Sequence, residues 1–136
     1  MTEYDRHKQM QRWTKDLNHY YLNCKALWQT DGDPSGFQWL AAEDAERSVL
    51  AYRRIDRKGK EVIAVCNFCP VLWDHYRIGL AKKGCYIPTL CSDSLIYGGT
   101  GVQLHAVRSE PSPNNGLNYS AEFTIPPLSI TFYEME

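Results

Sequence analysis

The first thirty residues place apolar and polar side chains with the period of a helix. Between residues 10 and 28 the apolar positions recur every three or four residues, which keeps them on one face for about five turns. The turn-forming residues 31–36 follow, and they end the helix because Pro34 cannot donate a backbone hydrogen bond. The pattern predicts a long amphipathic helix over residues 1–30 and a turn or linker over 31–36. Its apolar face is wide and aromatic, so we expect it to lie against a large body.

After residue 36 the pattern changes to the two-residue alternation of β-strands. The run from Val62 is apolar and β-branched, which is typical of a strand covered on both faces, and Pro70 should end it. The charged turn 56–60 predicts a hairpin that joins this strand to the one before it. About eight short strands without intervening helices indicate a mainly β domain over residues 37–136, either an antiparallel sandwich or a barrel with Greek-key connections. The expected strands are 37–42, 49–55, 62–70, 76–80, 85–90, 102–107, 119–125 and 128–133.

Composition limits the classes of partner. The 136 residues carry 15 basic and 16 acidic side chains, a formal net charge of −1, without a long block of one sign. This argues against nucleic acid or an anionic membrane as the main partner, because both attract a concentrated positive field. No apolar run approaches the roughly 20 residues of a membrane span, and the polar start does not resemble a signal peptide. Five cysteines at irregular spacing favour reduced thiols, so we expect a cytoplasmic protein.

The cysteine pair Cys66 and Cys69 has the spacing of zinc sites and redox motifs. A structural zinc needs four ligands, and Cys85 and Cys91 do not complete the pattern. A redox motif of this type opens a helix, whereas this one ends a strand, where residues three apart point to opposite faces. The sequence therefore favours two unrelated buried thiols over metal or redox chemistry.

The histidines, serines, carboxylates and glycine-rich segment also fit structural roles better than catalytic or binding ones. The four histidines share no metal-binding frame, and no serine lies in a nucleophile elbow. The carboxylates flank turns, where Asp and Glu are expected as solvated or capping groups, and the glycine-rich segment 97–101 lacks the lysine and helix of a phosphate loop. We therefore expect no catalytic residue, metal site or cofactor in this chain. The residues concerned are His7, His19, His75 and His105, and Asp31, Asp33, Glu43, Asp44 and Glu46.

Several short motifs follow one another in order along nearly the whole chain. They are Gln11-Arg12-Trp13, Asp16-Leu17-Asn18, Ala26-Leu27-Trp28, Asp33-Pro34-Ser35-Gly36-Phe37-Gln38-Trp39, Asp44-Ala45-Glu46-Arg47-Ser48-Val49-Leu50, Asn67-Phe68, Pro70-Val71, Tyr76-Arg77-Ile78-Gly79, Asp93-Ser94, Tyr97-Gly98-Gly99-Thr100-Gly101 and Ile125-Pro126-Pro127-Leu128-Ser129. In this order they resemble the C-terminal end of glycogen branching enzymes, members of the α-amylase superfamily. Cys69 stands where that family usually has Thr, Leu72-Trp73 replaces a usual Pro-Arg pair, and residues 103–113 diverge.

The resemblance implies a fold and a division of labour. Residues 1–30 would be the last helix of a catalytic (β/α)8 barrel, and residues 37–136 would be an all-β C-terminal sandwich. Enzymes of this family cleave an α-1,4 glucan and rejoin it through an α-1,6 bond with retention, using an Asp nucleophile and a Glu acid/base on the barrel. None of those motifs occurs here. The resemblance therefore implies a supporting domain that does not turn over glucan by itself.

Three hypotheses follow from the resemblance. The first is a structural domain whose helix face packs on the barrel, or on the sandwich or a second copy, giving an exposed apolar patch or a helix-mediated dimer. The second is an α-glucan-binding module, in which Trp73, placed outside just past the central strand, and its neighbours Tyr76 or Tyr97 would stack on sugar rings. The third is an active branching enzyme fragment, which the missing motifs disfavour.

Overall fold

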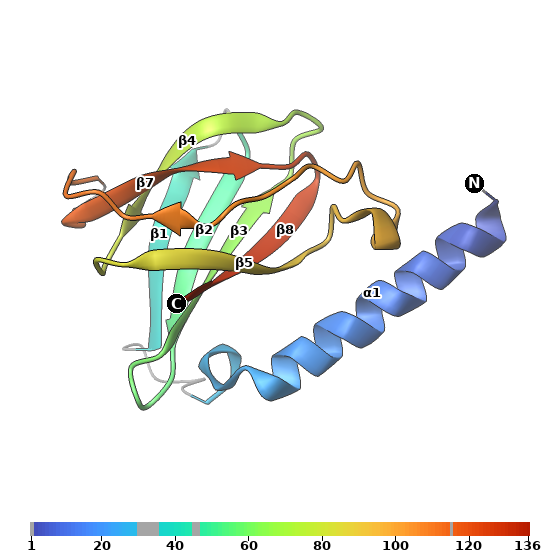
Figure 1. Cartoon of the computed structure of the whole chain (residues 1–136), viewed down its shortest axis with the longest axis horizontal. Helices are drawn as coiled ribbons and strands as arrows, with labels where there is room; N and C mark the ends of the chain where they lie inside the picture. The colour runs from blue at the N-terminus through green and yellow to red at the C-terminus, as the bar shows by residue number, and fades with distance from the viewer. Residues whose placement is uncertain (1, 30–35, 45–46, 115) are drawn as a thin grey trace.

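The computed structural model describes residues 2–29, 36–44, 47–114 and 116–136. Figure 1 shows a β-sandwich with one long helix along its side. The helical segments are α1 (Glu3–Asn23), followed by the 3₁₀ helices η1 (Lys25–Leu27) and η3 (Leu95–Tyr97). Eight strands form within the described residues: β1 (Phe37–Asp44), β2 (Val49–Ile55), β3 (Glu61–Asn67), β4 (Trp73–Leu80), β5 (Cys85–Cys91), β6 (Val107–Arg108), β7 (Tyr119–Ile125) and β8 (Ser129–Met135). The predicted mainly β fold with a preceding helix is confirmed.

Strand pairing divides the β domain into two layers. The larger sheet has the order β1-β2-β3-β8-β5-β6, and β4 pairs with β7 in a second, two-stranded sheet. All of these pairs are antiparallel, and the hairpin expected between β2 and β3 is present. β8 lies beside β3 although four strands separate them along the chain, which is the long return expected of Greek-key connections. The structure is therefore a sandwich rather than a barrel.

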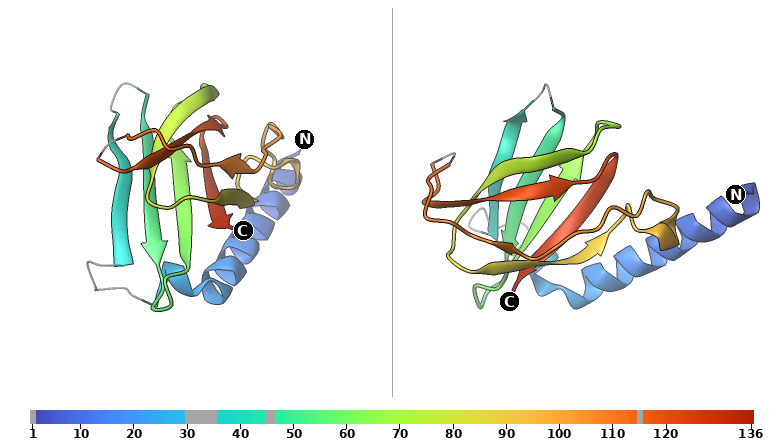
Figure 2. Two further views of the ribbon diagram at one scale, coloured as in Figure 1. Left: turned by 60° about the vertical axis from the view of Figure 1, so that its left-hand side comes forward. Right: turned by 45° about the horizontal axis from the view of Figure 1, so that its top comes forward.

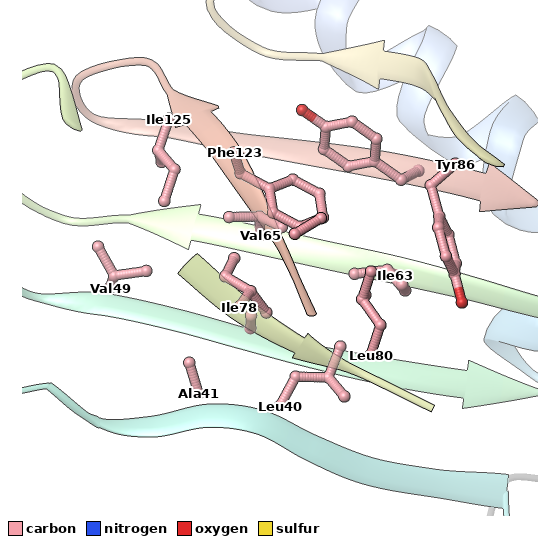
Figure 3. Close-up of a cluster of buried hydrophobic side chains, with 13 residues drawn as sticks. Leu40, Ala41, Val49, Ile63, Val65, Ile78, Leu80, Tyr86, Phe123 and Ile125 are labelled. Carbon is pink, nitrogen blue, oxygen red and sulfur yellow. The ribbon is translucent and has the colours of Figure 1, made fainter. Parts of the chain in front are cut away.

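β3 is buried on both faces, as its sequence predicts. Its residues alternate between two clusters of buried side chains, with Ile63 and Val65 in one and Val62 and Ala64 in the other. The first cluster fills the space between the two sheets, and Figure 3 shows its side chains converging there from both layers. The second lies on the outer face of the large sheet. Figure 2 shows α1 on that outer side, where it continues the second cluster.

The helix α1 begins with a capping box. The Thr2 hydroxyl accepts a hydrogen bond from the Asp5 N–H at 3.1 Å, and the Asp5 carboxylate accepts from the Thr2 N–H at 3.1 Å. The helix ends at Asn23, so the prediction that it continues to residue 30 is wrong. The chain leaves the helical path there because Cys24 takes an extended conformation and is buried, with Ala26, against the large sheet. The predicted linker spans residues 31–36, of which 31–35 lie outside the described residues.

Only part of α1 has a large body to lie against. Leu17 and Tyr20 pack on the second cluster, and Trp13 contacts the η3 loop, but no residue within Glu3–Asn23 is buried. The N-terminal half projects beyond the sandwich (Figure 1), and Met10 is largely exposed. The α1 sequence is too polar and charged for a membrane span, and no other helix among the described residues is long enough.

The strands differ from the prediction in several of their bounds and in the regularity of β1. The strand expected over residues 102–107 is reduced to Val107–Arg108, because the Asp93 carboxylate accepts a hydrogen bond from the Val102 N–H at 3.2 Å and so removes it from strand pairing. β3 ends three residues before Pro70, because the Asn67 side chain turns the chain. β1 contains a bulge that turns both Leu40 and Ala41 into the core, which interrupts the expected alternation.

Candidate functional site

The cysteine pair forms no site in this structure. Cys66 lies on β3, Cys69 lies in the following turn, and both are free thiols. Burial raises the pKa of the Cys66 thiol to about 11, which disfavours the thiolate that metal binding and redox chemistry require. Among the described residues no three His, Cys, Asp or Glu side chains lie close enough to hold a metal ion.

The histidines and carboxylates do not assemble either. All four histidines are exposed: His7 and His19 lie twelve residues apart on α1, His75 lies on β4, and His105 lies in the segment before β6. The Nδ1 atom of His75 lies 3.0 Å from a Glu122 carboxylate oxygen on β7. The carboxylate cluster expected around residues 31–46 lies outside the described side chains.

The glycine-rich segment is a closed loop rather than a phosphate cradle. The buried Asp93 carboxylate accepts from the Thr100 N–H at 3.0 Å and from the Thr100 hydroxyl at 2.7 Å. A Cβ atom at Gly99 would overlap the Asp93 carbonyl oxygen, so this close approach requires glycine. The N–H groups of Gly98, Gly99 and Gly101 donate to backbone carbonyl oxygens within the loop. The donors of the loop are therefore occupied and do not face an anion.

The structure separates the three aromatic residues predicted to contact glucan. Trp73 and Tyr76 share β4, and the guanidinium carbon of Arg47 lies 6.0 Å from the centre of each ring. Trp73 is half-buried, and its indole N–H donates to the Arg47 carbonyl at 3.2 Å. Arg47, which precedes β2 of the larger sheet, forms one aromatic and cationic edge with these two residues of the smaller sheet. Both rings also pack against the core between the sheets.

Tyr97 lies elsewhere, in the contact between η3 and α1. Its ring meets Trp13 edge to face at 5.0 Å, and its hydroxyl donates to the Asp16 carboxylate at 2.6 Å. Burial, together with this hydrogen bond to Asp16, raises the pKa of Tyr97 to about 12. Tyr97 thus helps to hold the helix against the β domain.

A second aromatic cluster was not identified from the sequence. Phe37, Trp39 and Tyr52 meet on the outer face of β1 and β2, with ring centres 5.0 Å apart for Phe37 and Trp39 and 6.0 Å apart for Trp39 and Tyr52. Trp39 is 53% exposed, although it lies within β1. The signal was present in the alternation of residues 37 and 39, but it does not tell which face of the sheet meets solvent.

The sandwich also contains a buried charge network. The Arg53 guanidinium contacts one Glu61 carboxylate oxygen at 2.7 Å, and the Tyr86 hydroxyl donates to the other at 2.6 Å. Arg53 also donates to the Gln38 side chain at 2.8 Å. Burial, reinforced by Glu61, raises the pKa of Tyr86 above its usual range, so the phenol stays protonated. Because each polar group has a partner, this network stabilises the junction of β1, β2, β3 and β5.

Comparisons with known proteins agree with this architecture. Residues 39–136 match the sequence model of the alpha amylase C-terminal all-beta domain. The whole chain aligns with a 1,4-alpha-glucan branching enzyme of Aquifex aeolicus at 39% identity over 138 residues. It covers 22% of that enzyme's length. The branching enzyme of Salinibacter ruber is 41% identical over 94% of the chain, and the chain covers 20% of that enzyme. The Vibrio cholerae enzyme is 38% identical over 98% of the chain, which covers 18% of that enzyme. The chain thus spans about a fifth of these curated relatives.

Proposed function

Because this chain belongs to the family of alpha amylase C-terminal all-beta domains, we propose that it is the non-catalytic C-terminal domain of a 1,4-α-glucan branching enzyme. In this proposal it stabilises the catalytic domain and does not act on glucan by itself. The observation that carries the proposal is the whole-chain similarity to enzymes about five times longer. The known catalytic chemistry of the family, a retaining transfer that makes α-1,6 branches, would belong to the catalytic barrel, with α1 as its last helix.

An iodine-staining assay on amylose tests this division of labour. We expect the isolated chain to leave the absorbance of the iodine–amylose complex unchanged. A hybrid of the Aquifex aeolicus enzyme, in which this chain replaces the matched segment, should lower that absorbance as branches form. The same enzyme truncated before the matched segment is the control and should lose most of its activity. Branching by the isolated chain would contradict the proposal.

The edge formed by Arg47, Trp73 and Tyr76 supports a second candidate function, contact with α-glucan. An indole and a phenol beside a guanidinium offer stacking surfaces and a hydrogen-bond donor to a sugar ring. Tyr97 would make a separate contact, beside α1.

Affinity electrophoresis in a glycogen gel tests this second candidate. Glycogen should retard the isolated chain, and Trp73→Ala should remove most of that retardation. Trp39→Ala is the matched control, since it removes the same kind of side chain from another face. Equal migration with and without glycogen would rule out this contact.

The other parts of the proposal concern location and assembly. A cytoplasmic location agrees with the five free cysteines. The exposed apolar residues of α1, Met10 and Leu22 among them, would contact the catalytic domain, or a second copy in a helix-mediated dimer.

A further inference from the structure

One row of side chains crosses the outer face of the large sheet. Trp39 stands opposite Tyr52, Tyr52 opposite Ala64, and Ala64 opposite Phe132 in the registers of β1, β2, β3 and β8. Side chains directly opposite one another share a face of a sheet. The row is therefore one continuous apolar band. Its end at Phe132 and its end at Trp39 differ in how far other parts of the chain cover them.

The helix covers only one end of this band. Tyr20 of α1 packs on Phe132 with the ring centres 5.2 Å apart, and both Val62 and Ala64 are buried under the helix and η1. At the other end Trp39 is 53% exposed, and Phe37 and Tyr52 are half-buried. The bare end is an aromatic surface that lies directly beside a helix-covered one.

The composition of the bare end is that of an interface centre. Phe37 and Tyr52 stack with ring centres 5.3 Å apart, and the Arg54 guanidinium carbon lies 5.8 Å from the centre of the Phe37 ring. Trp, Tyr and Arg are the residues that most often dominate the binding energy of protein interfaces. Single exposed apolar residues are ordinary, but a contiguous aromatic cluster beside a covered apolar face marks an interaction surface.

The length of the relatives indicates what covers this end. The chain matches 18–22% of each enzyme, and the matched domain is a C-terminal one, so about four-fifths of those enzymes lies mostly before it. α1 already occupies the adjoining half of the same face, and its own outer side exposes Met10 and Leu22. A domain that covers the exposed end of the band would therefore lie next to α1 on the same face of the sheet.

We propose that Phe37, Trp39 and Tyr52 form the surface on which the preceding catalytic domain of the enzyme docks, next to α1. This inference rests on the proposed function and adds the face and the residues through which the support is given. Trp39 lies at the centre of that interface, because it is the most exposed of the three side chains. The edge at Trp73 belongs to the other sheet and takes no part in it.

Hydroxyl-radical footprinting read by mass spectrometry tests the proposal without any substitution. The oxidation rate of Trp39 is measured in the isolated chain and in the Aquifex aeolicus hybrid. We expect it to fall at least about fivefold in the hybrid, because side chains at an interface centre are almost fully desolvated. Trp73 is the internal control of the same residue type, and its rate should stay the same. If the hybrid does not fold, the corresponding hybrid of the Salinibacter ruber enzyme replaces it.

Three results would contradict the proposal that the catalytic domain docks on this face. If Trp39 is oxidised at the same rate in the isolated chain and in a hybrid that branches amylose, no domain covers this face, while the proposed function would stand. Protection of Trp39 in the isolated chain by maltoheptaose would assign the cluster to glucan. Protection that grows with the concentration of the isolated chain would assign it to a second copy. A protected Trp39 in a folded hybrid without branching activity would support the docking face and contradict the proposed function.

Discussion

Replacing Glu61 with alanine should lower the free energy of unfolding of the chain by about 3–5 kcal/mol, because it leaves a buried charge without its partner. The side chains of Arg53 and Glu61 are only 11% and 1% exposed, so water cannot replace the lost carboxylate. The Tyr86 hydroxyl would lose its acceptor at the same time. Urea unfolding followed by fluorescence measures the difference.

A neighbouring ion pair provides the control for Glu61. Lys60 lies 3.6 Å from Glu134, but its side chain is 66% exposed. Exposed pairs contribute little, so Lys60→Ala should change the free energy of unfolding by less than about 1 kcal/mol. A loss for Glu61→Ala as small as that for Lys60→Ala would show that the buried network does not stabilise the sandwich.

Asn67→Ala should lower the free energy of unfolding by about 3 kcal/mol, because it leaves several buried polar groups without partners. The Asn67 amide donates to the Val71 and Pro126 carbonyl oxygens, both at 2.9 Å, and its own oxygen accepts from the Cys69 N–H at 2.9 Å. One side chain thus joins the turn after β3 to the turn between β7 and β8. Thermal unfolding by circular dichroism measures the loss.

Asn23→Ala is the matched control for Asn67. Its amide also donates to a backbone carbonyl, that of His19 at 2.8 Å, but this bond lies at the exposed end of α1. Surface substitutions of this kind usually change stability by no more than about 0.5 kcal/mol. Equal effects of the two substitutions would mean that the turns do not depend on Asn67.

The elements that could be predicted are those whose signal is local. The β-branched run from Val62 is buried on both faces, and the turn 56–60 makes the expected hairpin. The boundaries that were missed depend on distant partners. The helix ends early because Cys24 and Ala26 meet the large sheet, and the strand before Val107 is lost because Asp93 takes the Val102 N–H. Neither contact leaves a pattern in the neighbouring sequence.

The exposure and grouping of the aromatic residues also depend on contacts that are distant in the sequence. The alternation of Phe37 and Trp39 places both rings on one face, but their exposure depends on how far α1 extends across the sheet. The glucan-binding hypothesis groups Tyr97 with Trp73, yet the Tyr97 hydroxyl donates a hydrogen bond to Asp16 of the helix. The sequence therefore predicts candidate aromatic residues, whereas their grouping requires the tertiary structure.

The thermal midpoint of the catalytic domain in the hybrid enzyme tests most directly whether this chain is a supporting domain. Differential scanning calorimetry compares the hybrid with the same enzyme truncated before the matched segment. We expect the midpoint of the catalytic domain to be several degrees higher in the hybrid, since a docked partner stabilises the folded state by mass action. Identical midpoints, with this chain unfolding in a separate transition, would contradict a supporting role.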